Sequence, residues 1–458
     1  MKAIILAAGK GKRFNETGIP KPAVNVCGVP LILRNIFFLK KLGLDVVVVG
    51  GHKFDRLREI LPEDVELIKN NSIERGNAFS VLCAQNSLSF GPDDFVAGSQ
   101  ESLILEDIRK SSISDYAQNK LKGRFLVLMG DHVYTEEFLK NTLNAPANSA
   151  IVSKESDLID TDEATKILAR EGKILDIGKE IEEWNYIDTG AFLCEDSIFK
   201  TLNDLFCEED HVEWSDVINR SDMNVYENEE PWMDVDTKED LKRAEDLLMR
   251  SLKKDEDGFI SRHINRRFSR LITKRLVNFD IEPNLISIFS FLLCIASSLF
   301  FYGKILWIGG ILAQISSVLD GCDGEIARLK LKESEFGGFL DSILDRYGDA
   351  MIMLGMFSLL KFNFLNISIL AAALFGSLTI SSTAWRFENN FKEKIHTHEG
   401  WIRYIPAKRD ERMFIIFLGG ILGTIWLPAI FCSLFIIAIL SNLRIIGRIL
   451  IARKMREA

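Results

Sequence analysis

Apolar runs dominate the second half of this chain, and carboxylates interrupt them where carboxylates are costly. The runs fall at residues 284–303, 305–322, 337–360, 364–386, 412–430 and 431–450. Several of them approach the ~20 residues that a helix needs to cross a bilayer. A carboxylate at membrane depth normally faces a partner, a cavity or an ion. The sequence therefore predicts an all-α membrane domain of six transmembrane helices with a polar site inside it.

Four aspartates form two pairs, and each pair shares one helix face: Asp320 with Asp323, and Asp341 with Asp345. Two acidic faces on adjacent helices make an oxygen-rich cage suited to Mg²⁺ or another divalent cation, and such a cage can hold a diphosphate. The alternative is that these acids pair with basic residues at a helix end, namely Arg328, Lys330 and Arg346.

The stretch 320–345 fits the pattern D-x2-D-G-x2-A-R-x8-G-x3-D-x3-D at every fixed position. It resembles the signature of the CDP-alcohol phosphotransferases, membrane enzymes that form phosphodiesters by displacing CMP. The resemblance implies that Asp320, Asp323 and Asp341 are metal ligands and that Asp345 is both a ligand and the general base. A nearby dication would keep that base ionised. The resemblance also places four residues at the nucleotide: Asn284, Gly324, Arg328 and Gly337.

Basic residues indicate the orientation of this half. They cluster at 253–275, 328–332, 386–412 and 453–456. The opposite side of the predicted bundle has only Lys304 and Lys361. The positive-inside rule then predicts a multi-pass protein of the cell membrane, with both termini and the acidic site on the cytoplasmic side. A homodimer through this half is left open.

Residues 259–279 combine an apolar stripe with a basic face, which predicts a helix lying flat at the membrane interface. A charged linker helix in water is the alternative. The basic loop at 386–412 also allows two interpretations. In the first, its positive charge follows from the positive-inside bias alone. In the second, the loop binds an acceptor phosphate, and the candidate residues are Arg386, Arg403, Lys408 and Arg409.

Charge is unevenly divided along the chain. Residues 258–458 carry 24 Lys and Arg against 16 Asp and Glu, which leaves 32 against 49 for residues 1–257. An acidic half joined to a basic, apolar half favours membrane attachment and argues against a nucleic-acid partner. The predicted domains are 1–249, a linker with the interfacial helix at 250–280, and 281–458.

Residues 1–249 alternate strand-like and helix-like segments. Strands are expected near 2–7, 45–50, 65–69, 124–129 and 148–153, with helices near 30–42, 53–61 and 75–88. This pattern predicts a Rossmann-like α/β sheet with its ligand at the carboxyl ends of the strands. Residues 89–122 are an apparent insertion of unknown role.

The first strand leads into the glycine-rich turn of KAIILAAGKGKR, followed by IPKPAV at 19–24. Glycines there free backbone N–H groups to wrap phosphates. Together the two segments resemble the signature of the nucleotidyltransferases that activate phosphosugars. The resemblance implies nucleotide contacts at Leu6, Ala8, Gly9, Gly11, Arg13 and Lys21, and catalytic roles for Arg13 and Lys21 as neutralisers of phosphate charge. Lys12 departs from the Thr or Ser that is usual in the family.

The same resemblance implies two metal-binding carboxylates in this half. Asp131 ends the strand RFLVLM, and Asp236 lies in WMDVDT, with Asp234 as the alternate. The other interpretation is that they are N-cap and turn aspartates. Gly76 and Asn77 match the region that contacts the base in relatives, and Lys179 the region that holds the sugar phosphate.

As a whole the chain is similar to bifunctional enzymes that pair an inositol-1-phosphate cytidylyltransferase with a CDP-alcohol phosphotransferase. This similarity implies that CTP, inositol 1-phosphate and CDP-inositol are its substrates and that both sites use Mg²⁺ or another divalent cation. Two alternatives remain at this stage. The acceptor is instead a lipid alcohol, which makes the protein a phospholipid synthase, or the first half is catalytically inactive.

Overall fold

The computed structural model describes residues 1–11, 19–85, 87, 123–154, 161, 164–252 and 258–457. The predicted site residue Arg13 and the apparent insertion at 89–122 lie outside these described residues. The chain divides into two compact units, which we call unit 1 (Met1–Ser251) and unit 2 (Leu252–Ala458).

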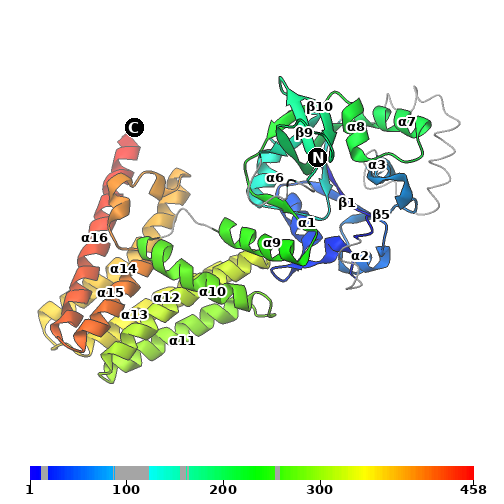
Figure 1. Ribbon diagram of the computed structural model, residues 1–458. Coiled ribbons are helices and arrows are strands. Elements are labelled where there is room, and N and C mark those ends of the chain that lie inside the picture. The colour runs from blue at the N-terminus through cyan, green and yellow to red at the C-terminus, as the bar shows by residue number, and fades with distance from the viewer. Residues whose placement is uncertain are drawn as a thin grey trace. The chain divides into compact units, whose positions relative to one another are not determined.

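Unit 1 is built on a nine-stranded sheet with the order β5-β4-β1-β6-β11-β8-β12-β10-β9 (Figure 1). The strands are β1 (Lys2–Ala7), β4 (Asp45–Gly50), β5 (Glu66–Lys69), β6 (Arg124–Met129), β8 (Ser149–Ser153), β9 (Lys166–Arg170), β10 (Lys173–Gly178), β11 (Tyr186–Glu195) and β12 (Asn224–Glu227). Parallel pairing joins β5, β4, β1 and β6, whereas β11 is antiparallel to both β6 and β8. Two small sheets pair β2 (Asn25–Val26) with β3 (Val29–Pro30) and β7 (His132–Tyr134) with β13 (Trp232–Asp234).

Alternation along the strands gives the sheet a core on each face. In β1, Ile4 and Leu6 belong to one core and Ala3 and Ile5 to the other, because successive side chains point to opposite faces. Helices α3 (Asn77–Cys83), α7 (Ile198–Glu208) and α8 (Trp214–Arg220) supply the first core. Helices α1 (Leu31–Lys41), α2 (Phe54–Ile60) and α6 (Glu136–Thr142) supply the second. The unit ends in α9 (Lys238–Ser251).

Unit 2 is helical. A π-helical segment, η4 (Ser261–Asn265), leads into α10 (Arg266–Leu276). Long helices follow: α11 (Pro283–Tyr302), α12 (Leu306–Leu329), α13 (Glu335–Phe357), α14 (Phe364–Phe391), α15 (Arg409–Gly423) and α16 (Pro428–Glu457). Figure 1 shows them running side by side, with α11 packed on α12 and α13, α14 on α16, and α12 on α15.

Small residues allow the close helix contacts in unit 2. A Cβ on Gly310 of α12 would lie 2.8 Å from the carbonyl oxygen of Phe417, and one on Gly420 of α15 would lie 2.7 Å from that of Leu306. Both distances are shorter than a side chain tolerates, so α12 and α15 touch backbone to backbone. Such contacts are typical of helices that pack within a membrane.

Three helices of the described residues are long and apolar enough to cross a membrane: α11, α14 and α16. Of the others, α12 and α13 carry the four aspartates of the signature, and α15 spans only 15 residues. The bundle therefore has a helix at each of the six predicted runs, but length and composition identify only three of them as spans.

Helix α10 exposes both apolar and basic side chains. Phe268 and Leu271 are more than half exposed, and Arg267 and Lys274 on the same helix are exposed as well. On the inner side, Ile272 packs against a buried apolar cluster of α11 and α12. A helix that presents apolar and basic side chains together is of the kind that lies at a membrane interface.

Candidate active sites

In unit 1 a group of carboxylates gathers where β6 ends. Gly130 follows β6 and lies so close to β1 that a Cβ there would be 2.6 Å from the carbonyl oxygen of Leu6. This contact places Asp131 at the carboxyl edge of the parallel strands. The small sheet of β7 and β13 then sets His132 opposite Asp234. Asp131, His132 and Asp234 each offer one ligand atom, and these atoms lie within 4.8 Å of one another.

Lys21 lies at the centre of this group. Its Nζ is 2.7 Å from Asp131 Oδ2 and 3.2 Å from Asp234 Oδ1, and it also donates a hydrogen bond to Asp236. Burial acts to lower the pKa of Lys21, but the charges of Asp131 and Asp234 outweigh it and raise that pKa. Lys21 thus comes together with the two predicted carboxylates, Asp131 and Asp236, and with the alternate, Asp234.

The electrostatics of Asp131 favour its charged form. Burial alone would raise the pKa of Asp131, but the charge of Lys21 and the hydrogen bond with His132 hold it well below its usual range. A cluster of ionised oxygens at this spacing, with an imidazole beside it, fits a divalent cation. Asp188 in β11 is a contrasting carboxyl, because burial raises its pKa to about 6.

His132 is a site residue that the sequence argument missed. Its Nδ1 lies 2.9 Å from Asp131 Oδ1, and its ring stacks on Trp232 at 5.6 Å between centroids. Gly190, at φ +68°, makes room for it, since a Cβ there would be 2.9 Å from His132 Nε2. Groups that orient a ligating carboxylate in this way are part of a metal site.

The variant His132→Phe is expected to keep the stacking on Trp232 while losing the contact with Asp131. Metal affinity should fall by about 10- to 100-fold. Titration with Mn²⁺, followed by electron paramagnetic resonance, measures the affinity. Unchanged Mn²⁺ affinity would show that His132 only fills space between Asp131 and Trp232.

The other predicted site residues of unit 1 are spread over several segments of the chain. Gly11 has φ +52°, and a Cβ there would lie 3.1 Å from Lys21 Cβ, so the glycine loop touches the lysine. A Cβ on Gly76 would lie 2.1 Å from the carbonyl oxygen of Val212, and the side chain of Asn77 accepts a hydrogen bond from the backbone N–H of Trp214. Gly76 and Asn77 thus contact the segment around Val212 and Trp214 through close packing and a hydrogen bond. Lys179 follows β10 and is exposed.

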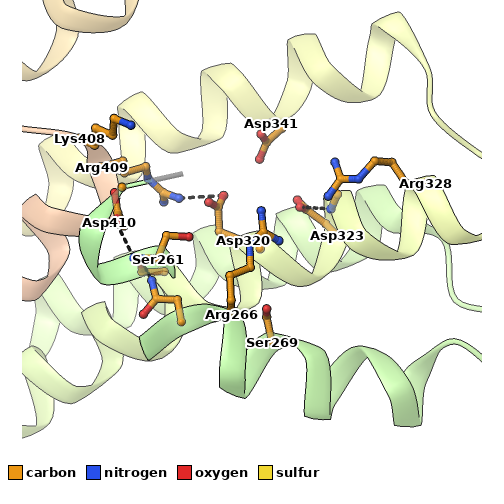
Figure 2. Close-up of a pocket in the computed structure, with 15 residues that line it drawn as sticks. Ser261, Arg266, Ser269, Asp320, Asp323, Arg328, Asp341, Lys408, Arg409 and Asp410 are labelled. Atoms are coloured by element: carbon orange, nitrogen blue, oxygen red, sulfur yellow. Dashed lines mark hydrogen bonds and ion pairs between the residues drawn. The ribbon is translucent and has the colours of Figure 1, made fainter. Parts of the chain in front are cut away.

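Unit 2 contains a polar cavity of about 320 Å³ beside α12. Three of the predicted metal ligands line it: Asp320, Asp323 and Asp341. Asp320, Asp341 and Asp345 each offer an oxygen, and these oxygens lie within 4.8 Å of one another. Figure 2 shows Asp341 of α13 facing Asp320 of α12 across the opening. This spacing fits a divalent cation held by oxygen ligands.

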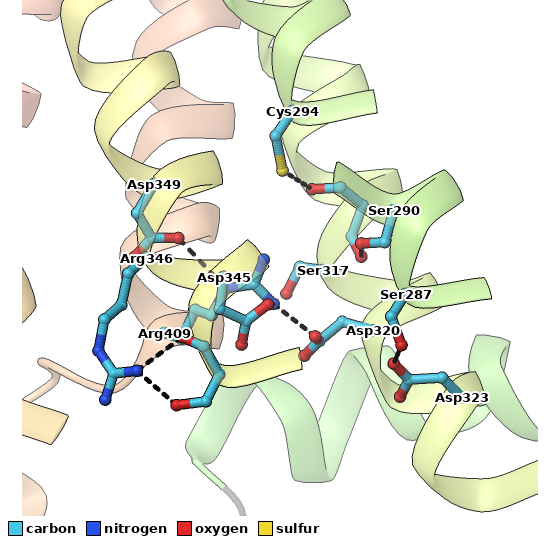
Figure 3. A network of polar contacts seen from close by, with 12 residues as sticks. Ser287, Ser290, Cys294, Ser317, Asp320, Asp323, Asp345, Arg346, Asp349 and Arg409 are labelled. Carbon is cyan, nitrogen blue, oxygen red and sulfur yellow. Dashed lines mark hydrogen bonds and ion pairs between the residues drawn. The ribbon is translucent and has the colours of Figure 1, made fainter. Parts of the chain in front are cut away.

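Asp323 faces the same cavity but has its own partners. It accepts a hydrogen bond from Ser287 Oγ of α11 and one of 2.5 Å from the backbone N–H of Gly324 (Figure 3). It is 7% exposed. These contacts fix its carboxylate at the wall of the cavity.

Arg409 connects the acidic residues of the two helices. Its Nη1 is 2.7 Å from Asp320 Oδ1 and 3.0 Å from Asp345 Oδ1, and its Nε is 3.2 Å from Asp349 Oδ1. The counterion of the signature aspartates is therefore an arginine from the start of α15. In contrast, Arg346 donates to the carbonyl and hydroxyl oxygens of Ser342 (Figure 3).

Of the four basic candidates for an acceptor phosphate, Lys408 and Arg409 line the cavity. Among the described lining residues, neither Arg386 nor Arg403 is present, and both side chains are exposed. The loop that carries Lys408 is fastened by the buried Glu399 to two arginines of α16, Arg444 and Arg448.

The predicted nucleotide residues occur as two neighbouring pairs. A Cβ on Gly337 would lie 3.0 Å from Asn284 Oδ1, and one on Gly324 would lie 3.4 Å from Arg328 Nη1. Gly324 and Arg328 line the cavity. The two glycines thus leave space beside the polar side chains of Asn284 and Arg328.

Comparisons with known proteins agree with this division. Residues 3–159 match the MobA-like NTP transferase domain, and residues 281–452 match the CDP-alcohol phosphatidyltransferase family. The chain is 35% identical over 455 residues to the bifunctional IPC transferase and DIPP synthase of Archaeoglobus fulgidus, covering 98% of this chain and 84% of that protein. It belongs to the bifunctional IPC transferase and DIPP synthase family.

Other known proteins match all or part of this chain. The Aquifex aeolicus protein of the same name is 33% identical over 99% of this chain and 98% of its own. An archaetidylinositol phosphate synthase of Pyrococcus horikoshii is 32% identical over 41% of this chain and 91% of its own. Among solved structures, the chain is similar to the inositol-1-phosphate CTP transferase from T. maritima, with 24% identity, a TM-score of 0.42, and coverage of 54% of this chain and 94% of that one.

Proposed function

We propose that unit 1 makes CDP-inositol from CTP and inositol 1-phosphate. Unit 2 then transfers the inositol phosphate group to a second inositol 1-phosphate and releases CMP. The observation that carries the proposal is that each unit gathers carboxylates at cation-binding spacing, in a chain whose named relatives match both units together. The residues fit Mg²⁺ or another divalent cation, which would neutralise phosphate charge at both sites.

In unit 1 a phosphate oxygen of inositol 1-phosphate attacks the α-phosphorus of CTP, and pyrophosphate leaves. No base is required, because a phosphate monoester dianion is already nucleophilic. Asp131 and Asp236, with Asp234, hold the cation, and Lys21 and Arg13 neutralise the phosphates. Leu6, Ala8, Gly9, Gly11, Gly76 and Asn77 are the proposed nucleotide contacts, and Lys179 the proposed contact to the sugar phosphate.

In unit 2, Asp320, Asp323 and Asp341 hold the cation site for the diphosphate of CDP-inositol. Asp345 accepts the proton from a hydroxyl of the second inositol phosphate. That oxygen forms a bond to the β-phosphorus, and the bond to the CMP oxygen breaks. Lys408 and Arg409 support the acceptor phosphate in this proposal, because they line the cavity.

The proposal places unit 2 in the cell membrane as six transmembrane helices, with both termini and both sites on the cytoplasmic side. It assigns residues 1–249 to the cytidylyltransferase, 250–280 to the linker and interfacial helix, and 281–458 to the phosphotransferase. The exposed Phe268 and Leu271 of α10 and the three long apolar helices support this placement. A homodimer through the membrane domain is part of the proposal.

A purified preparation given CTP, inositol 1-phosphate and Mg²⁺, without lipid, is expected to form pyrophosphate, CMP and an inositol phosphodiester. Phosphorus NMR resolves these products together, and addition of EDTA should stop both reactions because both sites use a divalent cation. A phosphodiester that appears only when a lipid alcohol is added would replace the water-soluble acceptor with a lipid one. Absence of CMP under both conditions would contradict the proposed transfer.

A further inference from the structure

A buried carboxylate links the interfacial helix α10 to the helix of the signature. Glu325 of α12 occupies a variable position of the signature and is 0% exposed. Arg266 Nη1 donates to its Oε1 at 2.6 Å, Ser269 Oγ to the same oxygen at 2.8 Å, and Thr273 Oγ1 to Oε2 at 2.7 Å. All three donors come from α10. A buried charge is stable only when it is paired and hydrogen-bonded in this way.

Two of these donors belong to the wall of the cavity. Arg266 and Ser269 line it together with Asp320, Asp323 and Gly324. Figure 2 shows Arg266 on α10 beside Asp320, between Arg409 and Arg328. The side chain of Arg266 is 12% exposed, so it has little freedom to turn away. Glu325 thus fixes a guanidinium at the edge of the cation site.

We infer that Arg266, held in position by Glu325, binds the diphosphate of the CDP-alcohol donor. A guanidinium presents its N–H donors in a planar fork, and this fork matches phosphate oxygens. The inference rests on the proposed function of unit 2. The donor is favoured over the acceptor because Arg266 is bound by Glu325 of α12, the helix that carries Asp320, Asp323 and Gly324. The acceptor candidates Lys408 and Arg409 come from the start of α15.

The double variant Arg266→Gln/Glu325→Gln tests this assignment without leaving a lone buried charge. The two amides can still form a hydrogen bond, so the contact between α10 and α12 is retained. Loss of a charged hydrogen bond to phosphate should raise the KM for CDP-inositol, and the Kd for CDP, by about 10- to 100-fold. The KM for the acceptor should stay unchanged, and Arg266→Lys should recover part of the loss.

Arg267→Gln is the matched control, because Arg267 is the next residue of α10 and is exposed. It removes the same charge and should leave both constants as in the wild-type protein. Pyrophosphate release from CTP, measured on the same preparation, reports that unit 1 is intact. If the double variant fails to fold, Arg266→Lys decides, since it keeps the charge but loses the planar fork.

If the double variant binds CDP with wild-type affinity, the pair is only structural and the inference is overturned. If the double variant does not fold, wild-type affinity in Arg266→Lys would overturn it in the same way. A change confined to the acceptor KM would overturn it as well. Failure of the proposed function would give a different result, because the wild-type protein would then release no CMP from CDP-inositol. The CDP-binding measurement still tests Arg266 in that case, because it requires no transfer reaction.

Discussion

Asp345→Asn is expected to reduce CMP release by about 10²- to 10⁴-fold, the range of a general base, while pyrophosphate release from CTP continues at the wild-type rate. Asparagine has the shape of aspartate but cannot accept the proton of the attacking hydroxyl. The Asp345 carboxylate lies 3.0 Å from Arg409 and within the same oxygen cluster as Asp320 and Asp341. Both products are measured in one preparation, with CTP or CDP-inositol supplied separately.

Asp280→Asn is the control for Asp345→Asn. Asp280 is also an aspartate of unit 2, but its side chain is 93% exposed and pairs with Lys332 at 3.3 Å. Exposed pairs of this kind contribute little to stability, so both activities should be unaffected. Loss of both activities in Asp345→Asn would contradict two independent sites, and full CMP release would exclude Asp345 as the base.

Asp131→Asn should have the reciprocal effect. Pyrophosphate release from CTP should fall by about 10²- to 10³-fold, because a central charge of the cation site is lost. CMP release from supplied CDP-inositol should remain unchanged. Asp131 contacts both Lys21 and His132, and its ionised form is favoured there. Quenched assays with either substrate measure the two rates.

Asp55→Asn serves as the control in unit 1, since Asp55 is an exposed carboxylate in the first turn of α2. It should preserve both rates. If Asp131→Asn retains wild-type pyrophosphate release, then Asp131 is a turn residue and the cation site of unit 1 lies elsewhere.

Residue spacing predicted how the aspartates of unit 2 are grouped, because residues three or four apart on a helix share a face. Asp320 and Asp323 lie on α12, and Asp341 and Asp345 lie on the next helix, α13. The spacing could not identify the counterion. Arg409 comes from the start of a later helix, and no local periodicity connects it with α12.

Helix boundaries were predicted less well than helix positions. The fifth apolar run was placed at 412–430, whereas α15 is Arg409–Gly423 and α16 begins at Pro428. The apolar composition continues through the turn between the two helices, so hydropathy alone does not mark the break there. Pro428 does mark it, because proline is favoured in the first turn of a helix.

In unit 1 the sequence predicted Asp131 and Lys21 but not the role of His132. Asp131 lies in the turn between β6 and β7, and the sequence alone does not show how that turn directs the side chain of the residue that follows it. His132 joins the site because β13, about a hundred residues later, pairs with β7 and sets Asp234 opposite His132. Strand β12 is likewise set by long-range pairing, with β8 and β10, whereas β9 and β10 form a local hairpin.

We expect the aspartates of α12 and α13 to hold divalent cations for the diphosphate of a CDP-alcohol, even though Arg409 bridges Asp320 and Asp345. Anomalous diffraction from crystals of the full chain soaked with Mn²⁺ and a CDP-alcohol is the test. Mn²⁺ peaks should lie among Asp320, Asp323, Asp341 and Asp345, with the diphosphate bound to them. If the carboxylates instead stay paired to Arg409 with no peak between them, these aspartates are not a cation site.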